Sequence, residues 1–238
     1  SFSQFTDAAR VTQEVLKLGS LRVLVIGDLI VDKYTTVDPL GTTGKGNSLA
    51  ARAETSQIFF GGALAVANQV APFVRTVSLV CGIGSVERDG ENFAERANTT
   101  VAENVQTYFF DDGVSRTVVK ERFVTRYLEK LFELYHSTPF EKLGSRDNGA
   151  CLDWLAKNIQ DYDLVIVPDY GDGFISRDMT TVIAENAHYL ALNTQINSGN
   201  RGHHVVGRYQ NADLISLNEP ELRLACHDRE NPVPVLAQ

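Results

Sequence analysis

Residues 21–34 read Leu-Arg-Val-Leu-Val-Ile-Gly-Asp-Leu-Ile-Val-Asp-Lys-Tyr, and this stretch decides the fold class. Its first part, Leu21 to Ile26, is a short apolar run rich in β-branched residues, and Gly27-Asp28 bounds it. Such a run is typical of a strand that is buried on both faces of a parallel sheet. The sequence therefore predicts a buried parallel strand over 21–26, with Asp32 in the segment that follows it.

Outward from this stretch, strand-like and helix-like patterns alternate along the chain. Helices are predicted over 6–18, 63–73, 89–97, 151–159 and 179–187 and from 219 onward, and further strands over 76–81, 105–110, 164–167, 189–192 and 213–217. Repeated strand–helix alternation is typical of a parallel sheet that is covered by helices on both faces. We therefore expect an α/β fold with three layers and a mostly parallel central sheet.

Two segments break this rhythm because they contain strand patterns without helices. They lie at about 34–60 and 116–135, and both alternate in the manner of antiparallel strands. We interpret residues 1–238 as one domain with these two excursions forming a small β-strand lid.

Composition narrows the function classes. The net charge of −8 disfavours a general nucleic-acid binder, which needs a basic face to displace counterions. No apolar run approaches the roughly 20 residues of a membrane span, so we expect no membrane partner. Three scattered cysteines, Cys81, Cys151 and Cys226, favour a reducing compartment, and we expect the cytoplasm.

Polar and glycine residues follow the predicted strands, at the edge where parallel sheets bind ligands. They are Asp28 and Asp32, the pair Gly61-Gly62 that opens a helix, Asp169-Tyr170, Asn193, and Asn218-x-x-Glu221. Three of these have a structural alternative. The glycine pair is either a tight turn or a place where backbone approaches a ligand, and Asp32 is either a solvated acid or an acceptor for two sugar hydroxyls. Asn218 and Glu221 also fit a helix capping box.

Taken in order, these segments resemble the PfkB family of ribokinase-like carbohydrate kinases, and most of all its heptose 7-phosphate kinases. The matching segments are residues 25–34 (G-D-x-x-x-D-x-Y), 60–68 (G-G-A-A-N-V-A-x-N), 117–122 (T-x-x-K-x-R), 167–173 (S-D-Y-x-K-G) and 218–221 (N-x-x-E). The resemblance covers about residues 20 to 225.

The resemblance implies ATP-dependent phosphoryl transfer to a sugar or sugar phosphate, with Mg²⁺, and heptose 7-phosphate is one candidate substrate. By carry-over, the substrate-binding residues are Asp32, Gly61, Gly62, Asn68, Lys120 and Arg122. The cofactor-binding residues are Asn193, Asn218 and Glu221, with Glu221 reaching the metal through water. In such kinases the lid strands often form the contact of a homodimer.

The chain departs from the family pattern at two points. Ala65 stands where the family has the first Asn after the glycine pair, which removes a sugar contact. The family's G-x-G-D element, which carries the catalytic base, comes after N-x-x-E; neither Gly27-Asp28 nor Gly171-Asp172 matches it. The base is therefore expected beyond Gln238, and we expect the chain ending there to be inactive.

Two other functions remain open. One is a catalytically inactive kinase-like domain that binds a sugar phosphate or acts as a scaffold. The other is a Rossmann-type oxidoreductase, which the missing third glycine after Gly82 and Gly84 and the strand-only lid disfavour.

Overall fold

The computed structural model describes residues 7–44, 46–84, 92–113, 116–137, 148–200, 202 and 205–237. The strands are β1 (Arg22–Thr42), β2 (Leu49–Gly62), β3 (Thr76–Ile83), β4 (Val105–Asp111), β5 (Val118–Val124), β6 (Lys130–His136), β7 (Leu164–Asp169), β8 (Leu190–Thr194) and β9 (Leu214–Ile215). The helices are α1 (Ala8–Leu18), α2 (Ala63–Val70), α3 (Phe93–Asn98), α5 (Gly149–Asn158), α6 (Arg177–Asn186), α7 (Glu219–Cys226) and α8 (Val233–Leu236).

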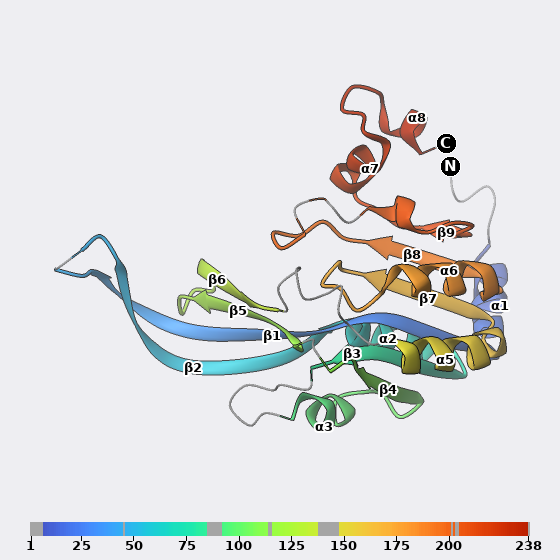
Figure 1. The fold of residues 1–238 in the computed structure, drawn as a ribbon, viewed down its shortest axis with the longest axis horizontal. Coiled ribbons are helices and arrows are strands. Elements are labelled where there is room, and N and C mark those ends of the chain that lie inside the picture. The colour runs from blue at the N-terminus through green and yellow to red at the C-terminus, as the bar shows by residue number, and fades with distance from the viewer. Residues whose placement is uncertain are drawn as a thin grey trace.

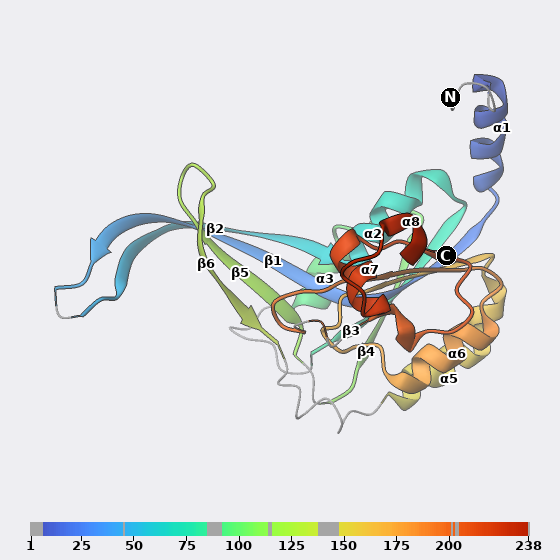
Figure 2. The same cartoon turned by 90° about the horizontal axis from the view of Figure 1, so that it is seen from above.

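The central sheet has the strand order β4-β3-β1-β7-β8-β9, and every neighbouring pair in it is parallel. Helices α5 and α6 lie on one face and α2 on the other (Figures 1 and 2). Two hydrophobic clusters fill the two spaces between sheet and helices, one centred on Leu155 and Met179 and the other on Leu64 and Leu79. The predicted three-layer α/β fold is confirmed.

Strand β1 is much longer than predicted, and it joins the sheet to the lid. Residues 22–28 pair with β3 in the sheet, whereas residues 29–42 pair with β2 in an antiparallel ribbon that reaches away from the body (Figure 1). Strand β5 pairs with the same lid part of β1, and β6 pairs with β5. The segments at about 34–60 and 116–135 therefore consist mainly of strands, as predicted. Asp32, however, lies inside β1 and not in a loop beyond it.

The boundary at Gly27 was predicted wrongly for a physical reason. A Cβ atom at this position would lie 2.5 Å from the carbonyl oxygen of Pro168 on β7. The glycine allows two strands to approach closely, and it does not end the strand.

Three smaller differences concern the edges of the fold. Helix α3 begins at Phe93, and the first residues of the helix predicted over 89–97 lie outside the described part of the chain. Strand β9 is limited to two residues, although a strand was predicted over 213–217. The apolar side chains of α1 are exposed, Val11 by 46% and Leu16 by 73%.

Candidate active site

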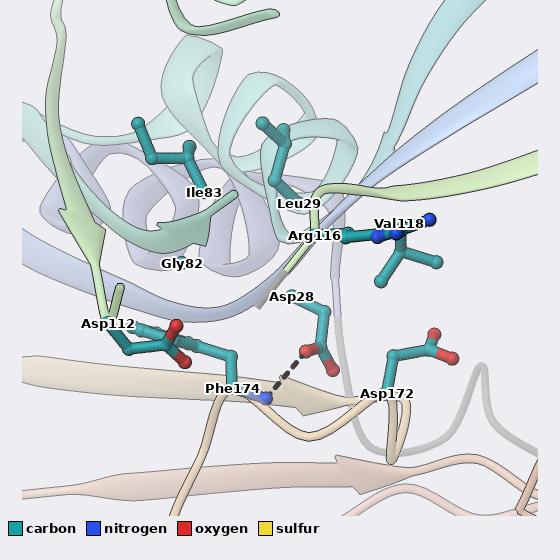
Figure 3. Close-up of a pocket in the computed structure, with 9 residues that line it drawn as sticks. All are labelled: Asp28, Leu29, Gly82, Ile83, Asp112, Arg116, Val118, Asp172 and Phe174. Carbon is teal, nitrogen blue, oxygen red and sulfur yellow. Dashed lines mark hydrogen bonds between the residues drawn. The ribbon is translucent and has the colours of Figure 1, made fainter. Parts of the chain in front are cut away.

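The candidate site lies where β1 leaves the sheet and enters the lid. A pocket there is lined by Asp28, Leu29, Gly82, Ile83, Asp112, Arg116, Val118, Asp172 and Phe174. Figure 3 shows the carboxylates of Asp28, Asp112 and Asp172 around this space. The pocket is at the carboxyl ends of β3, β7 and the sheet part of β1 (residues 22–28), the edge where open parallel sheets bind ligands.

Asp28 fixes the floor of this pocket. Its side chain is buried, and its Oδ1 accepts a hydrogen bond from the backbone N–H of Phe174 at 3.0 Å (Figure 3). The Phe174 ring in turn occupies the place that a Cβ atom of Gly82 would need. The loop after β7 is therefore held against β1 and β3.

The alternation of strand side chains places one polar set on the lid face that carries the site. The paired positions Asp32 and Lys120, Tyr34 and Arg122, Lys120 and Tyr135, and Arg122 and Glu133 lie opposite each other in the registers of β1, β5 and β6. Paired residues of neighbouring strands share one face of a sheet. The structure thus brings Asp32, Lys120 and Arg122 together, as the motifs implied.

Arg122 forms an ion pair with Asp32, and its Nε lies 3.6 Å from Glu133 Oε2. Burial lowers the pKa of Arg122, but the hydrogen bond and charge of Asp32 outweigh burial, and the net direction is upward. The guanidinium group is also 5.3 Å from the centre of the Tyr34 ring. Arg122 is therefore held by two acids and one ring.

Lys120 is the most enclosed cation of the site. Its Nζ lies 3.2 Å from Asp172 Oδ2, and the two side chains are 8% and 6% exposed. The rings of Tyr135 and Tyr170 stand 5.6 and 5.9 Å from the ammonium group. The sequence motifs did not indicate Asp172, because the resemblance in this segment points to Asp169 and Tyr170 and because Gly171-Asp172 does not match the G-x-G-D element.

Both glycines of the pair are required by the fold. A Cβ atom at Gly61 would lie 2.6 Å from Asp32 Oδ2, so this glycine makes room for the carboxylate. Gly62 has a φ of 62° and is the N-cap of α2, and a Cβ atom there would collide with the carbonyl oxygen of Asp28. At both glycines, the space predicted for a ligand is occupied by atoms of the protein, namely the Asp32 carboxylate and the Asp28 carbonyl oxygen.

Asn68 lies apart from this cluster. Its Nδ2 donates to Thr100 O at 3.0 Å, and its Oδ1 accepts from Ala102 N at 2.9 Å. Counted from Gly61, the second Asn of the family motif falls on Gln69 and not on Asn68. We therefore leave Asn68 out of the candidate site.

The predicted cofactor residues lie at the same edge of the sheet, toward β8 and β9, and their side chains are engaged within the protein. Asn193 Nδ2 donates to Ser216 O at 2.7 Å. Asn218 and Glu221 form the predicted capping box at the start of α7. Glu221 is buried, and its second oxygen accepts from Ile196 N at 3.2 Å.

The loop after β8 and the end of β7 form a connected polar network that the sequence did not reveal. Asn197 Nδ2 donates to Tyr170 O at 2.7 Å, and Asn200 Nδ2 donates to Gln195 O at 2.8 Å. Asp169, which is 1% exposed, accepts from Tyr209 Oη at 2.7 Å. Burial raises the pKa of Tyr209, and the charge of Asp169 raises it further. The available signal was the three Asn residues at positions 193, 197 and 200.

Among the described residues, no group of three or more His, Cys, Asp or Glu side chains has the geometry to hold a metal ion. In the same part of the chain, no helix is long and apolar enough to cross a membrane.

Comparison with known proteins bears on this geometry. No protein-family model matches the chain. The chain is 25% identical over 213 residues to a D-β-D-heptose 7-phosphate kinase of Bordetella bronchiseptica, covering 88% of this chain and 63% of that protein. It is 23% identical over 206 residues to the bifunctional protein HldE of Citrifermentans bemidjiense, covering 87% of this chain and 41% of that protein. The chain thus spans about half the length of these curated relatives.

Solved sugar kinases share the fold. The phosphofructokinase-2 of Escherichia coli in complex with fructose-6-phosphate superposes with a TM-score of 0.59 at 13% identity, over 92% of this chain and 68% of that one. The ribokinase of Arabidopsis thaliana, complexed with ribose and ATP, gives 0.53 at 12% identity, over 92% and 67%. The chain therefore has the ribokinase-like α/β fold, and its resemblance to the heptose 7-phosphate kinases is confirmed.

Proposed function

We propose that this chain is the sugar-binding part of an ATP-dependent carbohydrate kinase. The observation that carries the proposal is the position of Asp32 on the lid part of β1, where its carboxylate is held between Arg122 and Gly61, four residues along the strand from Asp28 of the pocket. A carboxylate held in this way can accept hydrogen bonds from sugar hydroxyls. The reaction would move the γ-phosphoryl group of ATP to a sugar hydroxyl and release ADP and a proton.

In this proposal each residue of the cluster has a separate role. Asp32 orients the sugar hydroxyls, and the backbone of Gly61 and Gly62 forms the wall next to it. Lys120 and Arg122 set the charge of the lid face, and the lid excludes water during transfer. The catalytic base stays a prediction for sequence beyond Gln238.

When bound, ATP supplies the phosphoryl group, and Mg²⁺ neutralises charge on its phosphates. Asn193, Asn218 and Glu221 have their side chains engaged in internal hydrogen bonds. We propose that they hold the loop 195–200 and the start of α7 at the nucleotide edge. In that role they act as positioning residues and do not themselves contact the metal.

Two features support the proposed homodimer and the proposed cytoplasmic location. Exposed apolar side chains on the lid, among them Phe132 and Leu134 of β6, suit a homodimer through the lid strands. The cysteines Cys81, Cys151 and Cys226 are free, in keeping with a reducing cytoplasm.

The experiment is a thermal-shift screen of sugars and sugar phosphates, including heptose 7-phosphate, with and without ATP and Mg²⁺. A ligand at 100 times its Kd adds about 2.7 kcal/mol to the free energy of unfolding. Stabilisation by at least one sugar or sugar phosphate is the expected result. Stabilisation by none of them contradicts the sugar-kinase proposal, and stabilisation by NAD instead favours the oxidoreductase.

An assay of phosphoryl transfer distinguishes an active kinase from an inactive kinase-like binding domain. The natural protein, including any sequence after Gln238, is assayed for ADP release with the sugar that stabilises the chain. ADP release that depends on the sugar supports the kinase. Sugar binding without any turnover favours the inactive kinase-like domain.

A further inference from the structure

The cations of the candidate site are already neutralised by acids of the protein. Lys120 is paired with Asp172 at 3.2 Å, and both side chains are almost fully buried. Arg122 is paired with Asp32 and lies 3.6 Å from Glu133. A charge-assisted contact in a buried place is stronger than one on the surface, because water screens it less.

The pocket beside these pairs is lined by more acidic than basic side chains. Three carboxylates line it, from Asp28, Asp112 and Asp172, against one guanidinium group, from Arg116 (Figure 3). A phosphate group with a charge near −2 would have to enter beside these carboxylates. Like charges at close range disfavour that arrangement, whereas carboxylates readily accept hydrogen bonds from hydroxyls.

Asp172 also reverses a charge in the motif that the chain otherwise resembles. In S-D-Y-x-K-G, Asp169 and Tyr170 match D and Y, and Asp172 falls on the position of K. A cation at this position would add to Lys120 and form a doubly positive surface suited to a phosphate. The acid at this position cancels Lys120 instead, and the rings of Tyr135 and Tyr170 close off the ammonium group.

We infer that Asp172 is a specificity-determining residue that holds Lys120 in a closed ion pair and makes this crevice select an uncharged sugar over a sugar phosphate. The inference rests on the proposed function and names its substrate class. The uncharged sugar places its hydroxyls on the carboxylates of the crevice, and its ring lies between the lid and the carboxyl ends of β1 and β7.

The test compares matched pairs of ligands by isothermal titration calorimetry with the full chain. The probes are ribose and ribose 5-phosphate, fructose and fructose 6-phosphate, mannose and mannose 6-phosphate, and inorganic phosphate. The proteins are the wild type, Asp172→Asn, and Asp153→Asn as a control that removes one acid from the exposed face of α5. The quantity of interest is the ratio of the two Kd values within a pair.

The inference predicts that the wild type binds at least one sugar more tightly than its phosphate. It predicts that Asp172→Asn shifts the ratio toward the phosphate by about tenfold or more, which is about 1.4 kcal/mol. Asp153→Asn leaves the ratio unchanged. If Asp172→Asn does not fold, the ratio of the two Kd values in the wild type is the test, and tighter binding of the phosphate overturns the inference.

Two results overturn the inference while the proposed function stands: tighter binding of the phosphate by the wild type, or a folded Asp172→Asn protein with an unchanged ratio. Binding of neither member of any pair, together with no stabilisation by any sugar or sugar phosphate in the thermal-shift screen, overturns the proposed function, and the inference fails with it. Stabilisation in that screen by a sugar phosphate alone overturns only the inference.

Discussion

At the scale of single residues, the geometry of the candidate site depends on the close contact between Gly61 and Asp32. The carboxylate lies so close to Gly61 that any side chain there would push it away. Its other oxygen is bound to Arg122, so moving the carboxylate also disturbs the lid face. A glycine that sequence patterns describe as a turn residue is here a packing requirement of an acid in the candidate site.

Gly61→Ala is therefore expected to abolish sugar binding and to lower the free energy of unfolding by about 1–3 kcal/mol, the usual effect of an overpacked position. Calorimetry measures the first effect and denaturant unfolding the second. Gly44→Ala is the matched control, because nothing lies within 4 Å of a Cβ atom at that position. Equal sugar affinity in the wild type and Gly61→Ala proteins would remove Asp32 from the site.

For Asn68 we expect a loss of stability without a loss of sugar binding. Its two hydrogen bonds hold the loop after α3, so Asn68→Ala should lower the free energy of unfolding by about 1–3 kcal/mol. The Kd of the sugar should not change. Gln69→Ala, one position along and exposed, serves as the control for stability. A large loss of sugar affinity in Asn68→Ala with normal stability would restore Asn68 to the substrate-binding set.

The sequence revealed the residues whose type and order match known motifs, namely Asp32, Lys120 and Arg122. It did not reveal Asp172, since the partner of Lys120 comes from a segment about 50 positions away. Periodicity says which face a side chain occupies, but it does not say which distant loop lies opposite. Only the fold of the β7 loop against β1 brings the two charges together.

At the scale of elements, the lid is stabilised by carboxylates on both of its faces, so its stability should depend on pH. Burial raises the pKa of Glu121. Hydrogen bonds from Lys33, Thr35 and His136 outweigh burial, and the net direction is downward from the usual value of 4.5. A lowered pKa in the folded state stabilises the fold above the unfolded-state value, and this contribution is lost as the pH falls through the folded-state value.

We therefore expect the lid strands to lose hydrogen-exchange protection as the pH falls below the usual carboxyl value of 4.5 and through the lower folded-state value. Glu121→Gln should make that loss smaller, because the variant has no carboxylate to protonate. The comparison is made on peptides from β5 and β6 at several pH values. The same pH dependence in both proteins would mean that Glu121 does not control the lid.

The elements also show where sequence patterns succeed. Short buried runs such as 76–81 and 164–167 have turn signals at both ends, and both are strands of the sheet. Strand β1 is different, because its first half is buried in the sheet and its second half is paired in the lid. One strand with two environments has no single period, so its length could not be predicted from the pattern.

At the scale of the whole molecule, the lid reaches away from the body (Figure 2). Its strands and turn carry exposed apolar side chains. Phe132 and Leu134 are 46% and 43% exposed, and Tyr127 in the turn before them is 88% exposed.

We expect a dimer in light scattering coupled to size exclusion, and Leu134→Glu should shift it toward the monomer. Leu16→Glu on α1, at an apolar position that is more exposed (73%) and far from the lid, should not. A monomer at all concentrations, or dissociation only by Leu16→Glu, contradicts a lid interface.

Hydrogen exchange with and without a bound sugar tests most directly whether one crevice, built from the lid and the carboxyl ends of β1 and β7, holds the substrate. The structure predicts that the sugar slows exchange in residues 28–34, 59–62, 118–122 and 169–174. It predicts no change in α5 and α6, which cover the sheet away from this edge. Slowed exchange confined to α5, α6 or α1, with the four crevice segments unaffected, would contradict the assignment of the site.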